Sequence, residues 1–597
     1  MKNKLRIANA GGFWGDDLKA FNRQITQGEI DYLTMDFLAE ITMSILKKQM
    51  TKNPELGYVT DFIEQIRENA ELISEKKIVV ITNAGGINPV ACGQKVTEVL
   101  NEMRLDLKVA VVYGDDIVDK IDEFYPEKTS FRNIETGEDF ETVKDKLQTA
   151  NVYLGAKPIV EALKKGAQII ITGRVTDTSI TMAPMIYEFG WSYDDWDKLA
   201  SGIVAGHIIE CGAQATGGNF SDWRLVDKWE NFGYPIVEIY PDGEFVVTKH
   251  DNTGGAVTID TVKEQLLYEM GNPSEYISPD VIADFKSIEL VQESADRVRV
   301  KNIKGKPSTP YYKVSMAYED GYKIEGSVIV SGPDVLRKAE KIKEIFWNRL
   351  GIDFERINTE FVGFNACHGS LAEYDDTNEI LLRFGAYDYD LKKLNEFSKQ
   401  IAPLILSSPP GIAVTGGRPK PRNVITYWPA LIPKSVVKAY LLIFPDAQYE
   451  IETVTGFEKE IENDNNEAQI SDGVESFTPV LPEQADTSVR FYDLCLARSG
   501  DKGDTANIGV IARNEKIYRF LKDYLTADYM KYLFRDLCKG KVVRYELPNL
   551  NAFNFLLEKS LDGGGTRSLK IDAQGKTYAQ AFLNQKISVP RRILNDD

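Results

Sequence analysis

The stretch GRVTDTS (173–179) combines a cation and a carboxylate directly after the β-branched run QIIIT (168–172). Ligand sites of parallel sheets lie at the carboxyl ends of the strands. At such an end Arg174 would clamp a carboxylate with two hydrogen bonds, and Asp177 would act as a base or a metal ligand. An Arg–Asp ion pair with a helix cap is the structural alternative, and the sequence leaves both open.

A second stretch, GHIIECGAQATGGNF (206–220), places an imidazole and a carboxyl group three residues apart, as His207 and Glu210. On a helix these two side chains and Cys211 share one face. The chain has only three histidines, so His207 is one of few candidates for an imidazole base, and Glu210 is an acid/base candidate. The alternatives are an incomplete metal site or a helix face packed beside a glycine turn.

The motif Asn-Ala-Gly-Gly occurs twice, in IANAGGFWGDD and in ITNAGGINP, each time after a short apolar run. Glycine pairs after a strand leave backbone N–H groups available to a phosphate or a carboxylate. The candidate binding residues in the two turns are Asn9, Gly11, Gly12, Asn83, Gly85 and Gly86. The alternative is a tight strand-to-helix turn. If the two strands are neighbours in one parallel sheet, both turns line one pocket at the same edge.

Two further residues are candidates for binding a nucleotide or a coenzyme A phosphate. Asp115 follows the run LKVAVVY (107–113), where a Rossmann domain keeps its ribose-binding acid. Arg418 lies in VTGGRPKPR, a local positive cluster in an acidic protein. The full G-x-G-x-x-G fingerprint is missing, which disfavours a nicotinamide oxidoreductase. A solvated loop is the alternative for the segment around Arg418.

The elements that must position these residues alternate between strands and helices over the first 230 or so residues. Strands are expected at Leu5–Ala8, Ile78–Thr82, Leu107–Tyr113 and Gln168–Thr172, and helices at Thr34–Met50, Tyr58–Ser74 and Val90–Met103. This alternation predicts an α/β fold, a large Rossmann-like module with a mostly parallel sheet. From about residue 222 to 449 the pattern becomes mixed, with a hairpin at 235–247 and a helix at Val335–Leu350.

The C-terminal part reads as a separate α+β domain. The stretch 458–479 is acidic and poor in large apolar residues, which is typical of a linker. Beyond it we expect strands at Val489–Leu496, Val542–Glu546 and Ala579–Lys586, helices at Glu515–Asp523 and Ala527–Leu537, and a polar loop at 497–509. The predicted organisation is a main domain over 4–455, a linker over 456–487 and a small domain over 488–590.

Composition excludes several classes of protein. The 597 residues carry a formal net charge of −19, which argues against binding to nucleic acid or to an anionic membrane. An anionic substrate would need a local positive site. No apolar run reaches the roughly 18 residues of a membrane span, and the start lacks the apolar core of a signal peptide. Five dispersed cysteines disfavour a disulfide framework or a zinc site. A cytoplasmic protein is expected.

Five motifs in order resemble the acyclic terpene utilisation AtuA family: IANAGGFWGDD, ITNAGGINP, ITGRVTDTS, GHIIECGAQATGGNFSDW and ARSGDKGDTANIGVIAR. Residues 4–455 resemble the main domain of that family, and 488–590 resemble its ferredoxin-fold C-terminal domain. The resemblance implies degradation of branched terpenoid acids through coenzyme A thioesters. It implies no settled reaction and transfers no catalytic residue.

These observations predict a catabolic enzyme acting on a branched acyl-CoA or a related carboxylate, with lyase or hydratase chemistry by acid/base catalysis. Arg174 would clamp the substrate, and Asp177, Glu210 or His207 would move protons. One alternative is a non-catalytic subunit that binds acyl-CoA, and another is a metal-assisted enzyme using Asp16, Asp17, Asp177 or Glu210. The expected ligand is a small molecule, and a homo-oligomer is expected on base rates.

Overall fold

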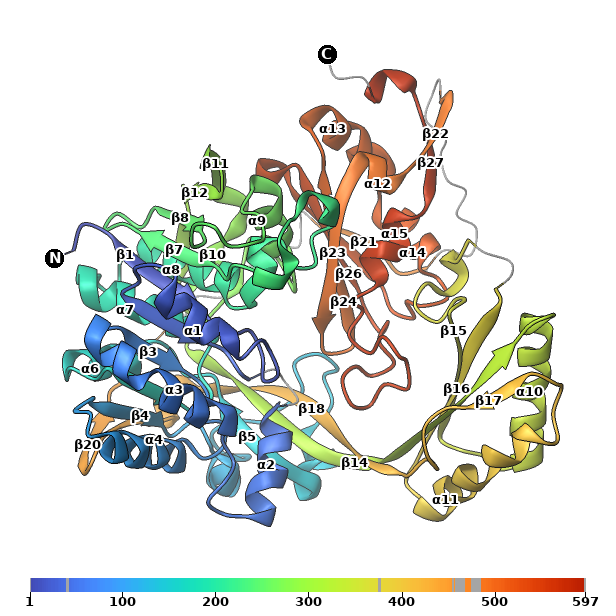
Figure 1. Ribbon diagram of the computed structural model, residues 1–597, viewed down its shortest axis with the longest axis horizontal. Helices are drawn as coiled ribbons and strands as arrows, with labels where there is room; N and C mark the ends of the chain where they lie inside the picture. The colour runs from blue at the N-terminus through green and yellow to red at the C-terminus, as the bar shows by residue number, and fades with distance from the viewer. Residues whose placement is uncertain are drawn as a thin grey trace. The chain divides into compact units, whose positions relative to one another are not determined.

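The computed structural model describes residues 2–38, 42–373, 377–453, 456, 468–473 and 485–594 (Figure 1). The chain forms two compact units. The first unit comprises Met1–Tyr318, Tyr427–Asp464 and Leu547–Leu550, and the second unit comprises Glu319–Thr426, Asn465–Glu546 and Asn551–Asp597. Two of the boundaries between them fall inside long strands, β14 (Tyr311–Ser331) and β18 (Arg422–Pro433). Most of the predicted linker 456–487 lies outside the described residues.

The first unit contains a run of five parallel strands, which the β-branched sequence runs predicted. They are β1 (Leu5–Asn9), β2 (Tyr32–Met35), β3 (Val79–Thr82), β6 (Ile169–Thr172) and β4 (Val109–Tyr113), in that order across the sheet. Each is parallel to its neighbour. Nearly all of their residues are buried, as expected of strands that are covered on both faces.

The register of these strands brings their carboxyl ends level. Ala8 pairs with Leu33, Leu33 with Val80, and Val80 with Ile169. Ile169 in turn pairs with Val109. The residues that follow each strand therefore meet along one edge. Both Asn-Ala-Gly-Gly turns lie at this edge, although β2 separates the two strands that carry them.

Helices cover both faces of the parallel strands. The helices α1 (Lys19–Thr26), α3 (Thr60–Lys76) and α4 (Pro89–Met103) share one apolar core with the strands. The helices α6 (Lys157–Lys164), α7 (Ser179–Phe189) and α8 (Trp196–Ile209) also contact strands of this sheet, but their residues lie outside that core. They therefore cover the opposite face.

The helix predicted at Thr34–Met50 is wrong in its first half. Strand β2 occupies Tyr32–Met35, and helix α2 spans Thr42–Lys52. The run YLTM is too short for its periodicity to distinguish a strand from a helix. Pairing with β1 and β3 decides the matter, because the strand fills a gap in the parallel order.

Antiparallel strands extend the sheet on both sides, as the mixed pattern of the middle region indicated. The predicted hairpin is confirmed as β7 (Ile236–Ile239) and β8 (Phe245–Thr248), with β7 antiparallel to β1. On the far side β19 (Ala439–Ile443) pairs antiparallel with β4. A small separate sheet centred on β10 (Val281–Asp284) packs against α8.

The described residues of the second unit form three sheets. In the first, β16 (Glu379–Asp388) lies between β14 and β15 (Arg356–Val362). The helices α10 (Val335–Leu350) and α11 (Leu391–Gln400) share an apolar core with this sheet, and the predicted helix Val335–Leu350 is confirmed. The second sheet has the order β21-β25-β26-β24-β23, with β21 (Gln469–Ser471) at one edge, β25 (Val542–Leu547) beside it and β26 (Ala552–Leu557) in the middle. The third sheet pairs β22 (Thr487–Arg490) with β27 (Lys586–Val589).

The polar stretch 497–509, expected as a loop, forms most of a β-hairpin. Strands β23 (Cys495–Lys502) and β24 (Thr505–Ala512) pair along their whole length. Alternation explains the polar density: Ala497 and Ile508 belong to the apolar core, whereas Arg498 and Asn507 occupy alternate positions that face away from it. The many polar residues of this stretch therefore reflect strands whose successive side chains lie on opposite faces of the sheet.

Two further expectations for this part are wrong. The predicted strand Val489–Leu496 is divided among β22 (Thr487–Arg490), the short helix α12 (Phe491–Leu494) and the start of β23. The predicted strand Ala579–Lys586 is mostly helix α15 (Tyr578–Leu583). Helix α15 packs against β23 and β24 through its apolar face, so tertiary contact selected the helix.

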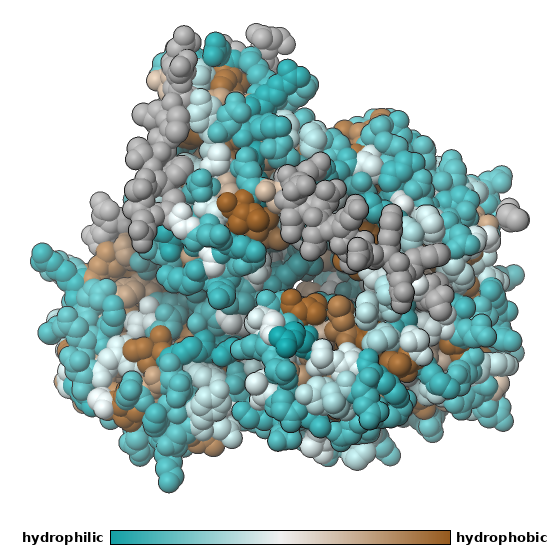
Figure 2. Space-filling view, turned by 180° about the vertical axis from the view of Figure 1, so that it is seen from behind, coloured by the Kyte–Doolittle hydropathy of each residue, from teal (hydrophilic) through white to brown (hydrophobic). Residues whose placement is uncertain are grey.

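Figure 2 shows one face, on which hydrophobic residues form separate patches among hydrophilic ones. None of the helices in the described part of the chain has the length and apolarity that a bilayer crossing requires.

Candidate active site

A carboxylate that the sequence analysis did not single out stands in the centre of the edge. Asp36 follows β2, between the two Asn-Ala-Gly-Gly turns, and is almost fully buried. Asn83 of the second turn donates from Nδ2 to Asp36 Oδ1 at 2.6 Å, and it accepts from the backbone N–H of Phe37 at 2.8 Å. Asn83, expected to bind a ligand, thus orients Asp36 in this structure.

Arg174 and Asp177 form the ion pair that the sequence offered as the structural alternative. Arg174 donates from its two terminal nitrogens to the two carboxylate oxygens of Asp177, at 2.6 and 3.4 Å. The guanidinium also lies over the Tyr153 ring, 4.2 Å from its centroid. The Arg174 side chain is buried, whereas that of Asp177 is 32% exposed. The pair therefore connects a buried cluster with solvent.

Asp115 holds the backbone beneath this pair. Its Oδ2 accepts from the backbone N–H of Arg174 and from Asn151 Nδ2, both at 2.9 Å. Gly173 is needed here because a Cβ at that position would collide with the Asp115 carboxylate. Burial raises the pKa of Asp115 to about 7. The Asp115 carboxylate is thus engaged inside the protein. Its role in binding a ribose stays a prediction.

The charges of Asp36, Arg174 and Asp177 influence one another. Burial, and then the nearby carboxylate of Asp177, hold the pKa of Asp36 well above its ordinary range, although Arg174 opposes this. Burial by itself would lower the pKa of Arg174, but the attractions of Asp177, Tyr153 and Asp36 together outweigh it and raise that pKa. One cation thus faces two carboxylates, which favours a proton held on Asp36.

The last turn of α8 supplies an imidazole–carboxyl pair. His207 Nδ1 lies 3.1 Å from Glu210 Oε1. The His207 ring is buried against the rings of Tyr276 and Phe285. Burial raises the pKa of Glu210, the hydrogen bond from His207 opposes this, and the charge of Asp177 adds to it. Among the described residues, neither Glu210 Oε2 nor His207 Nε2 has a hydrogen-bond partner.

Glycines allow these elements to approach closely. A Cβ at Gly206 would lie 2.7 Å from the Cα of Thr178, so this glycine lets α8 cross the start of α7 beside Asp177. A Cβ at Gly12 would lie 2.8 Å from the carbonyl carbon of Cys211. The first Asn-Ala-Gly-Gly turn therefore packs against the chain that carries Glu210.

Most of the backbone groups expected to hold an anion are engaged within the turns themselves. The N–H of Gly11 donates to Asn9 Oδ1 and that of Gly12 to Asp16 Oδ2, both at 2.9 Å. In the second turn the N–H of Gly86 donates to the carbonyl of Asn83, and Gly85 packs against the carbonyl oxygen of Thr172. In this structure the turns allow neighbouring segments to pack closely. Their role in anion binding stays a prediction.

Arg418, Asp16 and Asp17, the other predicted site residues, are each engaged by a neighbouring side chain. Arg418 belongs to the second unit, where its Nε donates to Ser398 Oγ at 3.0 Å. Asp16 accepts from the Tyr234 hydroxyl, and Asp17 pairs with Arg23. In the part of the chain that the structure describes, no three His, Cys, Asp or Glu side chains are grouped so that they could hold a metal ion.

The sequence model of the acyclic terpene utilisation family protein AtuA matches residues 5–442. The chain belongs to this family. The model of the AtuA ferredoxin-like domain matches residues 489–588, so the C-terminal part has the ferredoxin-like fold that the resemblance implied. Neither a curated protein nor a solved structure matches the chain.

The site also contains two residues that the sequence analysis missed because they lie outside the motifs shared with the AtuA family. They are Asp36 and Tyr153. Asp36 carried a signal, since it is an acid directly after the apolar run YLTM. That run was assigned to a helix, so the signal was lost. Tyr153 follows the edge strand β5 (Leu147–Val152) and has no pattern of its own.

Proposed function

We propose that this AtuA-family protein is a catabolic enzyme that acts on a branched, terpenoid-type acyl-CoA or a related carboxylate. The proposed chemistry is that of a lyase or hydratase, in which a proton is moved to or from a carbon near the carbonyl group. Membership of a family for acyclic terpene utilisation supports the substrate class. The site supports the type of chemistry.

The observation that carries the proposal is the free carboxyl oxygen of Glu210. Buried polar atoms almost always find a hydrogen-bond partner, so an unengaged one that lies beside other ionisable groups is a candidate for catalysis. Glu210 Oε1 is fixed by His207, which leaves Oε2 to exchange a proton with a substrate. The raised pKa of Glu210 brings its proton equilibrium closer to neutral pH, as an acid/base group requires.

Arg174 and Asp36 have supporting roles in this proposal. Arg174 is pre-oriented by Asp177 and Tyr153, and a substrate carbonyl or carboxylate would exchange with one of its hydrogen bonds. Asp36, with its raised pKa, would keep a second proton in the cluster. We also propose that the ligand approaches the carboxyl edge of the parallel strands, as in Rossmann-like proteins, although the strand order here differs from the Rossmann order.

The test is proton exchange on the substrate. The purified full chain is incubated in deuterated water with a panel of saturated and α,β-unsaturated branched acyl-CoA thioesters and the matching free acids. Incorporation of deuterium or addition of water is followed by mass spectrometry. We expect turnover for at least one member, and a loss of roughly 100-fold or more for Glu210→Gln.

A matched control is Glu360→Gln. Glu360 is also a buried glutamate whose pKa burial raises, but both of its oxygens accept hydrogen bonds, from Ile571 and Arg383. This variant should retain turnover. Thioester binding without any turnover would favour the non-catalytic subunit instead. Full activity of Glu210→Gln would refute the role of Glu210.

A further inference from the structure

Lys313, at the start of β14, is a half-buried cation without a counter-ion. Its side chain lies beside two aromatic rings, with Nζ 5.4 Å from the centroid of Tyr153 and 5.5 Å from that of Tyr427. No carboxylate of the described residues forms an ion pair with it. Lys249, which is buried in the first unit, is by contrast paired with Asp296. An unpaired charge in a partly desolvated place costs free energy, which calls for an explanation.

The backbone places Lys313 in line with the candidate active site. Three chain segments run side by side here. The N–H of Tyr153 donates to the carbonyl of Lys313 at 2.9 Å, and the N–H of Leu154 donates to the carbonyl of Arg174 at 3.4 Å. The Tyr153 ring is therefore shared by two cations, Lys313 and the guanidinium of Arg174.

The two cations differ in what they can still bind. The charge of Arg174 is balanced by Asp177, with which it makes two hydrogen bonds. Within the described part of the chain, no ion pair or hydrogen bond engages the Lys313 ammonium group, and the attraction of the two ring faces holds it in place. In a protein with a net charge of −19, this is the kind of local positive site that an anionic ligand needs.

We propose that Lys313 anchors an anionic group of the ligand, a carboxylate or a phosphate, beside Tyr153 and Arg174. The proposal deepens the proposed function and rests on it, because it assigns to the same site the group that fixes the charged part of the substrate. The anion would complete the charge balance that the described residues leave open at Lys313. Glu210 and Asp36 would then act on the part of the ligand that lies further along the edge.

The test is calorimetric titration of the full chain at low ionic strength, with four probes: coenzyme A, dephospho-coenzyme A, inorganic phosphate and 3-methylbut-2-enoate. The wild type should bind at least one of them. Lys313→Gln should bind that probe at least roughly tenfold more weakly, and Lys313→Arg should stay within about threefold of the wild type. Lys306→Gln, which removes the same charge from an exposed site on the same unit, should bind like the wild type.

The probes distinguish the two sources of the anion. A loss confined to coenzyme A and phosphate assigns Lys313 to a phosphate, and a loss confined to the branched acid assigns it to a carboxylate. If Lys313→Gln does not fold, Lys313→Met provides the neutral variant. Equal affinity of wild type and neutral variant overturns the anchor and leaves the proposed function standing. Failure of every probe to bind the wild type overturns both.

Discussion

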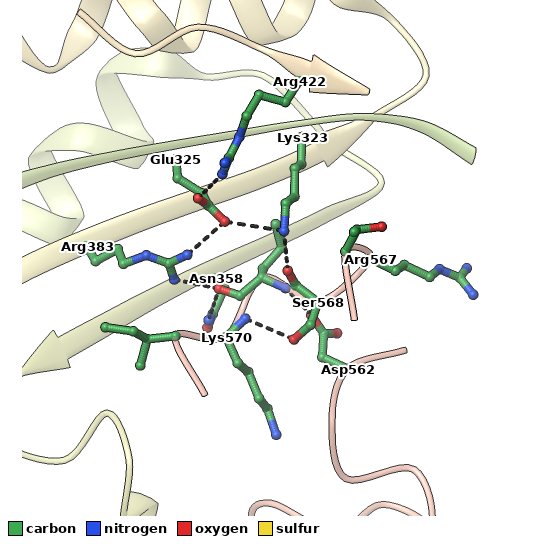
Figure 3. A network of polar contacts seen from close by, with 12 residues as sticks. Lys323, Glu325, Asn358, Arg383, Arg422, Asp562, Arg567, Ser568 and Lys570 are labelled. Atoms are coloured by element: carbon green, nitrogen blue, oxygen red, sulfur yellow. Dashed lines mark hydrogen bonds and ion pairs between the residues drawn. The ribbon is translucent and has the colours of Figure 1, made fainter. Parts of the chain in front are cut away.

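The two units each contain a dense cluster of charged side chains, and the clusters differ in the kind of atom that has no partner among the described residues: a carboxyl oxygen and an imidazole nitrogen in the first, and Arg356 Nε in the second. The carboxylate cluster of the first unit consists of Asp36, Arg174, Asp177, His207 and Glu210. The cationic network of the second unit surrounds Glu325, which accepts from Lys323, Arg383 and Arg422 (Figure 3). In the first cluster the carboxyl groups outnumber the cations. In the second, three cations surround the single carboxylate of Glu325.

The cationic network joins strands to a loop. Lys323 also donates to the carbonyl of Ser568 at 2.8 Å, and Arg383 donates to that of Leu569 at 2.7 Å. Arg356 pairs with Asp562 of the same loop. Figure 3 shows Lys323 and Arg383 reaching from the sheet toward this loop. Here the polar atoms are used to fix one segment on another, which is a structural role.

The carboxylate cluster leaves polar atoms unpaired at its centre. Glu210 Oε2 and His207 Nε2 are buried without a hydrogen bond from the described residues. The comparison teaches that the density of charged residues does not identify a functional site. The chemical type of the unpaired atom is more informative, because a carboxyl oxygen or an imidazole nitrogen can exchange a proton near neutral pH, whereas a guanidinium nitrogen cannot.

The largest expected effect comes from removing one arginine from each cluster. Arg174→Met removes the cation beside the buried Asp36, and Arg383→Met removes the ion-pair partner of the buried Glu360, which should each lower the free energy of unfolding by about 3 to 5 kcal/mol. Only Arg174→Met should also abolish turnover per folded molecule. Chemical denaturation and steady-state kinetics measure the two quantities. Loss of turnover in folded Arg383→Met would contradict the purely structural role of the second cluster.

The next effect is a pH dependence centred on Asp115. Burial raises the pKa of Asp115 to about 7, whereas an unfolded Asp titrates near pH 4. The folded state therefore holds a proton that the unfolded chain releases, so this group lowers stability as the pH rises from about 4 to about 7. Asp115→Asn should remove roughly 2 to 4 kcal/mol of that loss, visible as a melting temperature that depends less on pH.

The second unit provides the control with the opposite sign. The pKa of Asp388 is lowered: burial would raise it, but the hydrogen bonds from Lys393 and from the backbone N–H groups of Asp390 and Glu355 together outweigh burial. This group contributes stability above the unfolded pKa, and that contribution is lost as the pH falls through the folded pKa. Asp388→Asn should therefore destabilise at neutral pH and have little effect in acid. Parallel pH curves for the two variants would contradict the assignment.

A smaller effect should separate the two glycines of the first turn. A Cβ at Gly12 would meet the backbone of Cys211, whereas a Cβ at Gly11 would meet nothing within 4 Å. Gly12→Ala should cost about 1 to 3 kcal/mol and reduce turnover, because it displaces the chain next to Glu210. Gly11→Ala should change neither. The measurement is thermal unfolding together with kinetics on the same preparations.

The smallest effect is expected at the exposed end of the cationic network. The side chain of Arg422 is 62% exposed, although it contacts Glu325. Exposed ion pairs contribute little, so Arg422→Gln should change the free energy of unfolding by less than about 1 kcal/mol. A loss as large as that of Arg383→Met would show that the network acts as one unit.

Local sequence patterns predicted a good part of the fold. The parallel strands around Val80, Val111 and Ile170 and the helix Val335–Leu350 carried long or strongly β-branched patterns. The patterns failed where they were short or ambiguous, as at β2 and at α15. There, pairing with β1 and β3 or packing on β23 chose the structure.

The candidate site was predicted in part for a similar reason. Arg174, Asp177, His207 and Glu210 were visible as unusual residue types at helix or strand ends. Asp36 was hidden by the wrong element, and Lys313 looks like any lysine of an alternating strand. Lys313 becomes significant only because the ring of Tyr153, which follows strand β5, lies beside it.

The sequence by itself determined four of the five parallel strands, the two glycine turns that follow two of them, and membership of the AtuA family. Those features depend on neighbours within a few residues, or on motifs in order along the chain. The tertiary structure alone decided which charges are paired, which are buried and which atoms are left free. Ionisation and hydrogen bonding depend on burial and on partners distant in the chain, and folding is what brings Asp36, Arg174 and Glu210 to the same place.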